Sequence, residues 1–228
     1  MTGFVAGTLV HTRDGLVPIQ NIKPGDWVLS RSDRELTEYK KVTGVNSLLS
    51  EEILRISCFK NDEMEELTPA IYPQFASATQ LFWVESTVEV KEYQKWEIAS
   101  KLAGCSLLSN IRNENGLRFL DSHVVWDGCL DGLCVGGCDE LTLVRTHQLD
   151  MIIQFTDDNY YFVNLDKYNL DYQVEDFEII KSDYIHDSVV DNIYNTSTPK
   201  RLAVKTYTLK VEEYNSYFVG ENGLWVSN

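Results

Sequence analysis

Histidine and long apolar runs are both scarce in this chain of 228 residues. There are four histidines, and none lies between His11 and His123, so the side chain most often used for proton transfer is missing from a long stretch. No run approaches the ~20 apolar residues that a membrane-spanning helix needs. The N-terminus also lacks the basic start and long apolar stretch of a secretory signal peptide. We therefore expect neither a membrane segment nor a signal peptide.

Lysine and arginine are also few. Lysine and arginine number 20 against 35 aspartates and glutamates, which gives a formal net charge of -15. Such a chain is a poor match for the phosphates of nucleic acid or for anionic lipid. We predict no nucleic-acid and no membrane partner, and a basic protein if there is a partner at all. The plain alternative is that the acidic composition serves solubility alone.

Five cysteines are present, an odd number that fits no disulfide framework. Cys58 and Cys105 stand alone among apolar or small residues, so we expect both to be reduced thiols in the core. The other three lie close together in DGCLDGLCVGGCDE: Cys129, Cys134 and Cys138. They are candidate zinc ligands, with His123 or His147 as a fourth. The spacing is not C-x-x-C, and a glycine-rich turn with buried or reactive thiols is favoured, so we expect no metal and no cofactor.

Short strands separated by turn signals fill most of the chain, and 43% of the residues are hydrophobic, enough for a sizeable core. Asp14-Gly15 predicts a hairpin turn and residues 24–26 (PGD) a second turn. Residues 96–102 (WEIASKL) read as a short helix or helical turn. The segments expected to be strands are residues 4–12, 16–19, 27–29, 53–59 and 82–84.

The C-terminal part has the clearest strand pattern. Residues 206–211 alternate with period two, which is typical of a half-buried strand. One face carries Tyr207, Leu209 and Val211, and the other carries Thr206, Thr208 and Lys210. Asn222-Gly223 then lies between two apolar runs, which predicts a hairpin with a type I′ turn because that turn needs positive φ at both central residues.

Between residues 111 and 199 the sequence becomes rich in Asp, Asn and Tyr. It has apolar strands of its own at 151–155 and 160–165, and residues 190–200 read as an exposed connection. We interpret 111–199 as an insertion, partly structured and partly irregular. The flanking parts, 1–110 and 200–228, are then one domain.

Three blocks of this sequence resemble those of Hint domains, the fold shared by inteins and hedgehog autoprocessing domains. Residues 3–30 (GFVAGTLVHTRDGLVPIQNIKPGDWVLS) resemble the first splicing block, residues 77–108 the middle block, and residues 204–228 (VKTYTLKVEEYNSYFVGENGLWVSN) the last two blocks. The variant is similar to the pretoxin Hint domains of bacterial polymorphic and contact-dependent toxins. The resemblance implies an all-β, horseshoe-like fold of short strands with pseudo-twofold symmetry, here with an inserted mixed segment. In that fold the first and last strands meet at one site.

The resemblance also implies a chemistry. In the family, a first-block Cys attacks the preceding carbonyl to form a thioester, and a middle-block His and Thr assist. A terminal Asn then cyclises onto its own carbonyl with help from a penultimate His and from a His or Asp of the preceding block.

Carried onto this sequence, most of these positions are replaced. The nucleophile position is Gly3, the middle-block Thr and His fall on Ser77 and Gln80, and the later assisting positions fall on Asn215 and Ser227. Placing the middle block on Thr68-Pro69 restores no histidine either. Asn228 alone keeps its family identity, so it is the one candidate catalytic residue. Without a nucleophile, cleavage at the N-terminal junction is not expected.

We therefore expect a degenerate Hint domain, a pseudoenzyme acting as a structural or binding module in a bacterial toxin system. One alternative is an autoprocessing module that still releases a downstream toxin at Asn228, which the end of the chain at that residue favours. Another is a stand-alone acidic, immunity-like protein that binds a basic toxin, which the closeness of Met1 to Gly3 favours. The expected partners are a cognate toxin domain or a toxin-delivery protein. The expected location is the bacterial cytoplasm, or a secreted toxin if the sequence is part of a longer chain.

Overall fold

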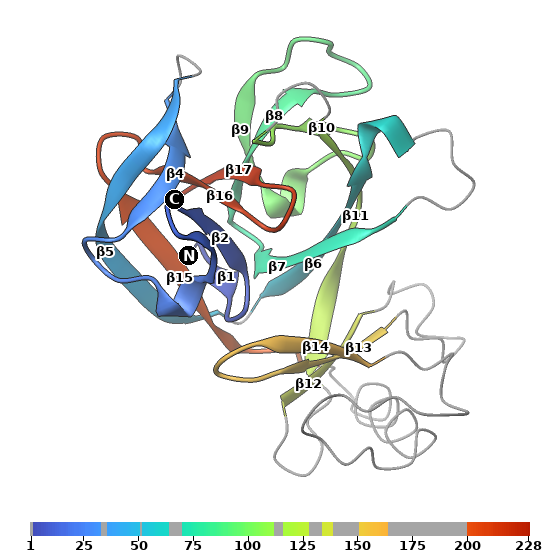
Figure 1. Cartoon of the computed structure of the whole chain (residues 1–228). Helices are drawn as coiled ribbons and strands as arrows, with labels where there is room; N and C mark the ends of the chain where they lie inside the picture. The colour runs from blue at the N-terminus through green and yellow to red at the C-terminus, as the bar shows by residue number, and fades with distance from the viewer. Residues whose placement is uncertain are drawn as a thin grey trace.

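Strands make up nearly all of the regular structure in the computed structural model, which describes residues 2–32, 36–50, 52–63, 70–111, 116–127, 134–138, 151–163 and 200–228 (Figure 1). Within these ranges helix occurs only as three short 3-10 turns, η1 (Ile19–Asn21), η2 (Asn61–Glu63) and η3 (Ala99–Lys101). The all-β prediction is confirmed. No helix in the described part of the chain is long and apolar enough to cross a membrane.

The N-terminal strands follow the predicted turns. The strands are β1 (Phe4–Val5), β2 (Leu9–Thr12), β3 (Gly15–Pro18), β4 (Trp27–Arg31) and β5 (Thr37–Ser50). The β2–β3 hairpin closes between Thr12 and Gly15, where the Thr12 hydroxyl accepts from the Asp14 amide at 3.1 Å and donates to the Gly15 carbonyl at 2.8 Å. Gly25 has φ +101 in the second predicted turn, a conformation that suits glycine. Both turns predicted from the sequence are confirmed.

The middle of the chain forms antiparallel strands that do not all pair in chain order. Its strands are β6 (Ile53–Lys60), β7 (Tyr72–Ser77), β8 (Leu81–Ser86), β9 (Lys95–Ile98), β10 (Leu107–Leu108) and β11 (Leu117–Asp127). β6 pairs with β7 on one edge and with β11 on the other. Residues 96–102 were expected to form a short helix or a helical turn. A helical turn is present as η3, but residues 96–98 belong to β9 because Trp96 pairs with Trp83 in the β8–β9 ladder. Sheet pairing there overrides the local helical preference.

The range interpreted as an insertion begins with β11, which pairs along β6 in the main sheet. The end of β11 also pairs with β12 (Cys134–Cys138), which leads through β13 (Met151–Phe155) to β14 (Tyr160–Val163). The apolar strand expected at 151–155 is therefore present, as is the described part, 160–163, of the one expected at 160–165. Phe155 and Tyr160 pack with Phe75, with ring centroids 5.4 and 4.8 Å apart respectively, in a second apolar cluster. The described part of this range is thus tied into the rest of the fold.

The two ends of the chain meet in the sheet. The C-terminal strands are β15 (Val204–Val211), β16 (Ser216–Val219) and β17 (Leu224–Ser227). β15 lies between β1 and β5, with Phe4 opposite Tyr207, and β17 pairs with both β16 and β8 (Figure 1). The main core lies beneath these strands and includes Phe4, Phe82 and Tyr217, all fully buried.

The β16–β17 hairpin is where it was predicted, but the turn type was wrong. Val219 pairs with Leu224, so the loop has four residues rather than two. Positive φ falls on Gly220 (+71) and Gly223 (+62), whereas Asn222 is not among the positive-φ residues. The loop is shaped by tertiary contacts: a Cβ on Gly223 would lie 2.8 Å from Ile111 atoms, and one on Gly220 would lie 2.8 Å from Gln74 Nε2.

Candidate functional site

Gly3, the residue predicted to stand at the nucleophile position, lies immediately before β1. Its φ is +149, and a Cβ built on it would lie 3.0 Å from Thr206 Cβ, from Thr206 Oγ1 and from the Tyr207 carbonyl oxygen. Thr206 was predicted to lie on the strand face opposite Tyr207, and it is buried with the Gly3 backbone against it. The backbone at position 3 is therefore shaped around the absence of a side chain.

Ser77 and Gln80 lie next to Gly3, at the end of β7 and in the turn that follows it. The Ser77 amide donates to the Gly3 carbonyl at 2.9 Å, and the Gln80 amide donates to the Ser77 carbonyl at 3.0 Å. The Gln80 side chain is fully buried, and its Nε2 donates to the Ser227 carbonyl at 2.7 Å and to the Leu81 carbonyl at 3.1 Å. Gln80 therefore joins the middle block to the last strand.

Two buried polar atoms in this corner have no hydrogen-bond partner among the described residues: Ser77 Oγ and Gln80 Oε1. A buried hydroxyl or carboxamide oxygen without a partner is costly. Both atoms belong to residues that the sequence comparison assigned to the middle block. Here neither group can donate or remove a proton at neutral pH, because a hydroxyl and a carboxamide do not titrate there.

Asn228 follows β17 and is held by β15. Its side-chain Oδ1 accepts a hydrogen bond from Thr208 Oγ1, and its Nδ2 donates to the Leu209 carbonyl. Cyclisation of an asparagine requires its side-chain nitrogen to attack its own backbone carbonyl. Both the oxygen and the nitrogen of this carboxamide are instead hydrogen-bonded to β15. These bonds oppose the side-chain rotation that would bring the nitrogen to the carbonyl.

Asn215 and Ser227 contribute backbone and hydroxyl groups rather than acid-base chemistry. Asn215 has φ +52, and its carbonyl accepts from the Asn228 amide at 3.3 Å and from Ser227 Oγ at 3.1 Å. Asparagine tolerates the left-handed region better than most residues. The two positions therefore fasten the end of the chain to the turn before β16.

The titratable side chains near these residues do not supply a replacement base. Tyr217 is fully buried beside Thr208, and burial raises the pKa of its phenol, so the hydroxyl stays protonated. His11 Nε2 bonds with the Gly220 carbonyl at 2.8 Å, at the opposite end of β17. Buried His123 lies on β11, with Nε2 3.4 Å from Asp121 Oδ2. Asn228 is thus surrounded by groups that hold it rather than by groups that activate it.

The structure resembles solved intein-like domains. A solution structure of a bacterial intein-like domain from Clostridium thermocellum covers 100% of this chain and 99% of its own, with a TM-score of 0.53 and 18% identity. This chain has a Hint fold. Two intein structures match less well. The gp41-1 intein has 12% identity and a TM-score of 0.47, over 100% of this chain and 99% of that one. The Ssp DnaB mini-intein variant M86 has 9% identity and a TM-score of 0.45, over 99% of this chain and 92% of that one. No family model and no curated protein matches the sequence.

The Hint fold accounts for the convergence of the sequence-predicted positions. Gly3, Ser77, Gln80, Asn215, Ser227 and Asn228 come from both ends and the middle of the chain, and the structure brings all six together. The likeness is one of fold and carries no activity with it, because the identity is low.

The cysteine predictions have mixed outcomes. Cys58 is a buried free thiol, as expected, but Cys105 is exposed and was wrongly placed in the core. Cys105 lies in a turn with φ +62, a position that keeps it at the surface. Cys129 and His147 lie outside the described residues, as do the side chains of Cys134 and Cys138. In the described part of the chain no group of three or more metal-ligating side chains occurs.

Neither described thiol is placed to substitute for the missing nucleophile, and their reactivities should differ. Burial and the nearby Asp121 carboxylate raise the pKa of Cys58 to about 12, so its thiolate is scarce at neutral pH. Native protein treated with iodoacetamide at about pH 8 should be modified at Cys105 and spared at Cys58, as judged by peptide mapping. Denatured protein is the control in which both react. Equal modification of Cys58 in the native state would contradict its placement.

Two residues that hold the site escaped the sequence reasoning. Thr208 was predicted only to share a strand face with Thr206 and Lys210, and that period-two position does not indicate that it bonds Asn228. Arg31 is buried at the end of β4 and donates to Ser109 Oγ and to the Asn110 carbonyl, both at 3.0 Å. The sequence offered no clear signal for this burial, because Arg31 lies between Ser30 and Ser32 at the end of its strand.

Proposed function

We propose that this chain is a catalytically degenerate Hint domain, unable to perform Cys-dependent autoprocessing, that acts as a structural or binding module in a bacterial polymorphic toxin system. The observation that carries the proposal is a site whose residues are brought together but include neither a nucleophile nor a histidine. The six residues that the sequence blocks assign to the family's catalytic positions are linked by hydrogen bonds. Gly3, assigned to the nucleophile, has no side chain, and Gln80, assigned to the proton donor, bonds the Ser227 carbonyl through its amide. The toxin context rests on the resemblance of the sequence blocks to pretoxin Hint domains.

Retention of Asn228 at the end of β17 favours one second candidate, slow release of a downstream segment at that residue. The contacts of the Asn228 side chain oppose this release. Thr208 and the Leu209 carbonyl hold both ends of the carboxamide, and Gln80 bonds the carbonyl of Ser227 rather than that of Asn228. General acid-base assistance is typically worth about 10²–10⁴ in rate, and no such group contacts Asn228 in the described part of the chain.

The test is a fusion with a reporter domain upstream of Thr2 and a reporter peptide after Asn228. We expect the intact mass to remain unchanged over a day at neutral pH, with or without added thiol. The fusion carrying Asn228→Ala is the matched control, and circular dichroism confirms that both are folded. Release of the downstream reporter within hours, lost in Asn228→Ala, would establish the second candidate instead. Release of the upstream domain would refute the proposal altogether.

A further inference from the structure

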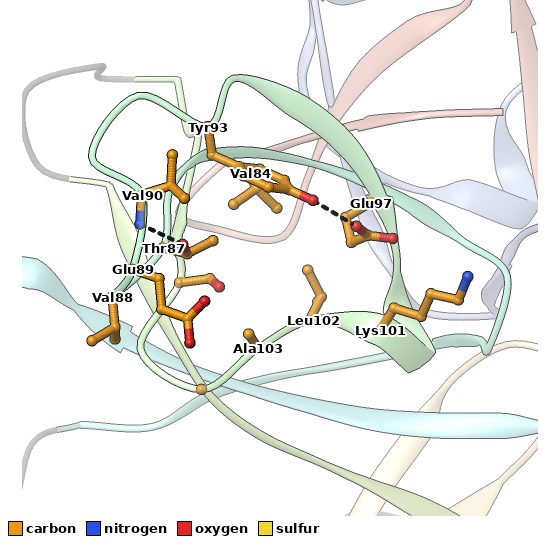
Figure 2. Close-up of a pocket in the computed structure, with 12 residues that line it drawn as sticks. Val84, Thr87, Val88, Glu89, Val90, Tyr93, Glu97, Lys101, Leu102 and Ala103 are labelled. Carbon is orange, nitrogen blue, oxygen red and sulfur yellow. Dashed lines mark hydrogen bonds between the residues drawn. The ribbon is translucent and has the colours of Figure 1, made fainter.

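A pocket of about 400 Å³ lies away from the Hint site, between the β8–β9 loop and the segment from η3 to β10 (Figure 2). Its floor is apolar: Val84 is 1% exposed, and Leu102 and Ala103 lie across from it. Val88 and Val90 of the loop also line it and are 75% and 45% exposed. The pocket therefore offers apolar surface that the fold itself leaves partly uncovered.

The shape of the pocket is fixed before any ligand arrives. The Thr87 amide donates to the Val90 carbonyl at 2.9 Å, and the Val90 amide donates to Thr87 Oγ1 at 3.0 Å. The Tyr93 amide donates to the Glu85 carbonyl at 2.9 Å. Ordering the β8–β9 loop would therefore cost a ligand little conformational entropy, which favours binding.

Two carboxylates stand at opposite ends of the pocket, and they determine its charge (Figure 2). Glu97 accepts a hydrogen bond from the Tyr93 hydroxyl at 3.1 Å, which orients it. Glu89 has no ion-pair partner among the described residues. Lys101 also lines the pocket, but its ammonium points away from the centre in Figure 2.

We propose that this pocket binds a lysine or arginine side chain presented by a partner polypeptide. The aliphatic stem packs on Val84 and Leu102, and the cation reaches Glu89, where a charge-assisted hydrogen bond is strong. Glu97, at the other end of the pocket, adds electrostatic attraction over a longer distance. The chain's net charge of -15 attracts a basic partner over a longer range. An acidic side chain would meet two carboxylates, and an aliphatic one would leave them unpaired. The inference rests on the proposed function as a binding module and names the chemistry of its partner.

The test uses the full ¹⁵N-labelled chain and three probes: acetyl-Ala-Arg-Ala-amide, acetyl-Ala-Lys-Ala-amide and the uncharged isostere acetyl-Ala-citrulline-Ala-amide. The arginine and lysine peptides should give saturable shifts at the amides of Val84, Val90 and Leu102. The citrulline peptide should bind about tenfold more weakly, the scale of one charge-assisted contact. Raised salt should weaken the cationic peptides alone.

Variants locate the binding. Glu89→Gln should weaken the arginine peptide several-fold, and the double variant Glu89→Gln with Glu97→Gln should abolish saturation. Glu92→Gln is the matched control, because it removes the same charge from the same loop at a residue that does not line the pocket. Equal shifts with citrulline, an equal loss in Glu92→Gln, or no saturation up to the solubility limit would each overturn the inference. Its failure leaves the reporter-release result untouched, so the two proposals fail separately.

Discussion

Replacing Gly3 with cysteine is expected to lower the free energy of unfolding by about 1–3 kcal/mol and to restore no cleavage at the Thr2–Gly3 bond. The cause is geometric. At φ +149 a residue with a Cβ is strained, and that Cβ meets Thr206 and the Tyr207 carbonyl at 3.0 Å. Thr206 and the Tyr207 carbonyl must shift before a thiol fits. Gln80 also cannot protonate the departing amide nitrogen. Urea denaturation gives the stability, and intact mass after thiol addition gives the cleavage.

Gly44→Cys is the matched control for this experiment. Gly44 lies in β5 without a positive φ, and a Cβ there meets only Lys210 side-chain atoms, the nearest at 3.5 Å. The same new thiol at that position should leave stability nearly unchanged. A Gly3→Cys protein as stable as the parent, releasing its upstream reporter, would show that the site needs only its nucleophile. Such a result would mean that the backbone conformation at position 3 does not prevent cleavage.

Arg31→Lys should cost about 2–4 kcal/mol of unfolding free energy although it preserves the charge. The buried guanidinium donates through Nε to Thr37 Oγ1 at 2.9 Å and through its two terminal nitrogens to Ser109 and Asn110. It also lies 4.8 Å from the ring centre of Phe218 and 5.2 Å from that of Trp225. An ammonium cannot reproduce this planar fork, so buried acceptors lose their donor.

The measurement is again chemical denaturation, with Arg118→Lys as the control. Arg118 makes a similar pair of bonds, to Asn61 Oδ1 and to the Cys105 carbonyl, but it is only partly buried. Solvent can replace those contacts, so its loss should stay below about 1 kcal/mol. Equal costs at the two positions would contradict a special role for Arg31. Because Arg31 joins β4 to the β16–β17 hairpin, its loss should also raise hydrogen exchange in β17.

Local signals predicted the N-terminal turns of this fold well. The hairpin at Asp14-Gly15 and the turn at residues 24–26 depend on residues adjacent in sequence, and both formed as expected. Predictions failed where distant contacts prevail. Residues 96–98 became a strand because Trp96 pairs with Trp83, and the loop before Leu224 has four residues because Gly220 and Gly223 pack against Gln74 and Ile111.

The sequence by itself determined that position 3 has no side chain and that position 80 has no imidazole, because these are properties of Gly3 and Gln80 alone. It also determined the strand-rich character, which follows from short-range patterns. The tertiary structure alone decided that both ends and the middle of the chain meet at one point, that Gly3 has a backbone unsuited to other residues, and that β15 holds both ends of the Asn228 side chain. These features arise from pairing between segments far apart in the chain, and such pairing depends on the packed core rather than on any local pattern.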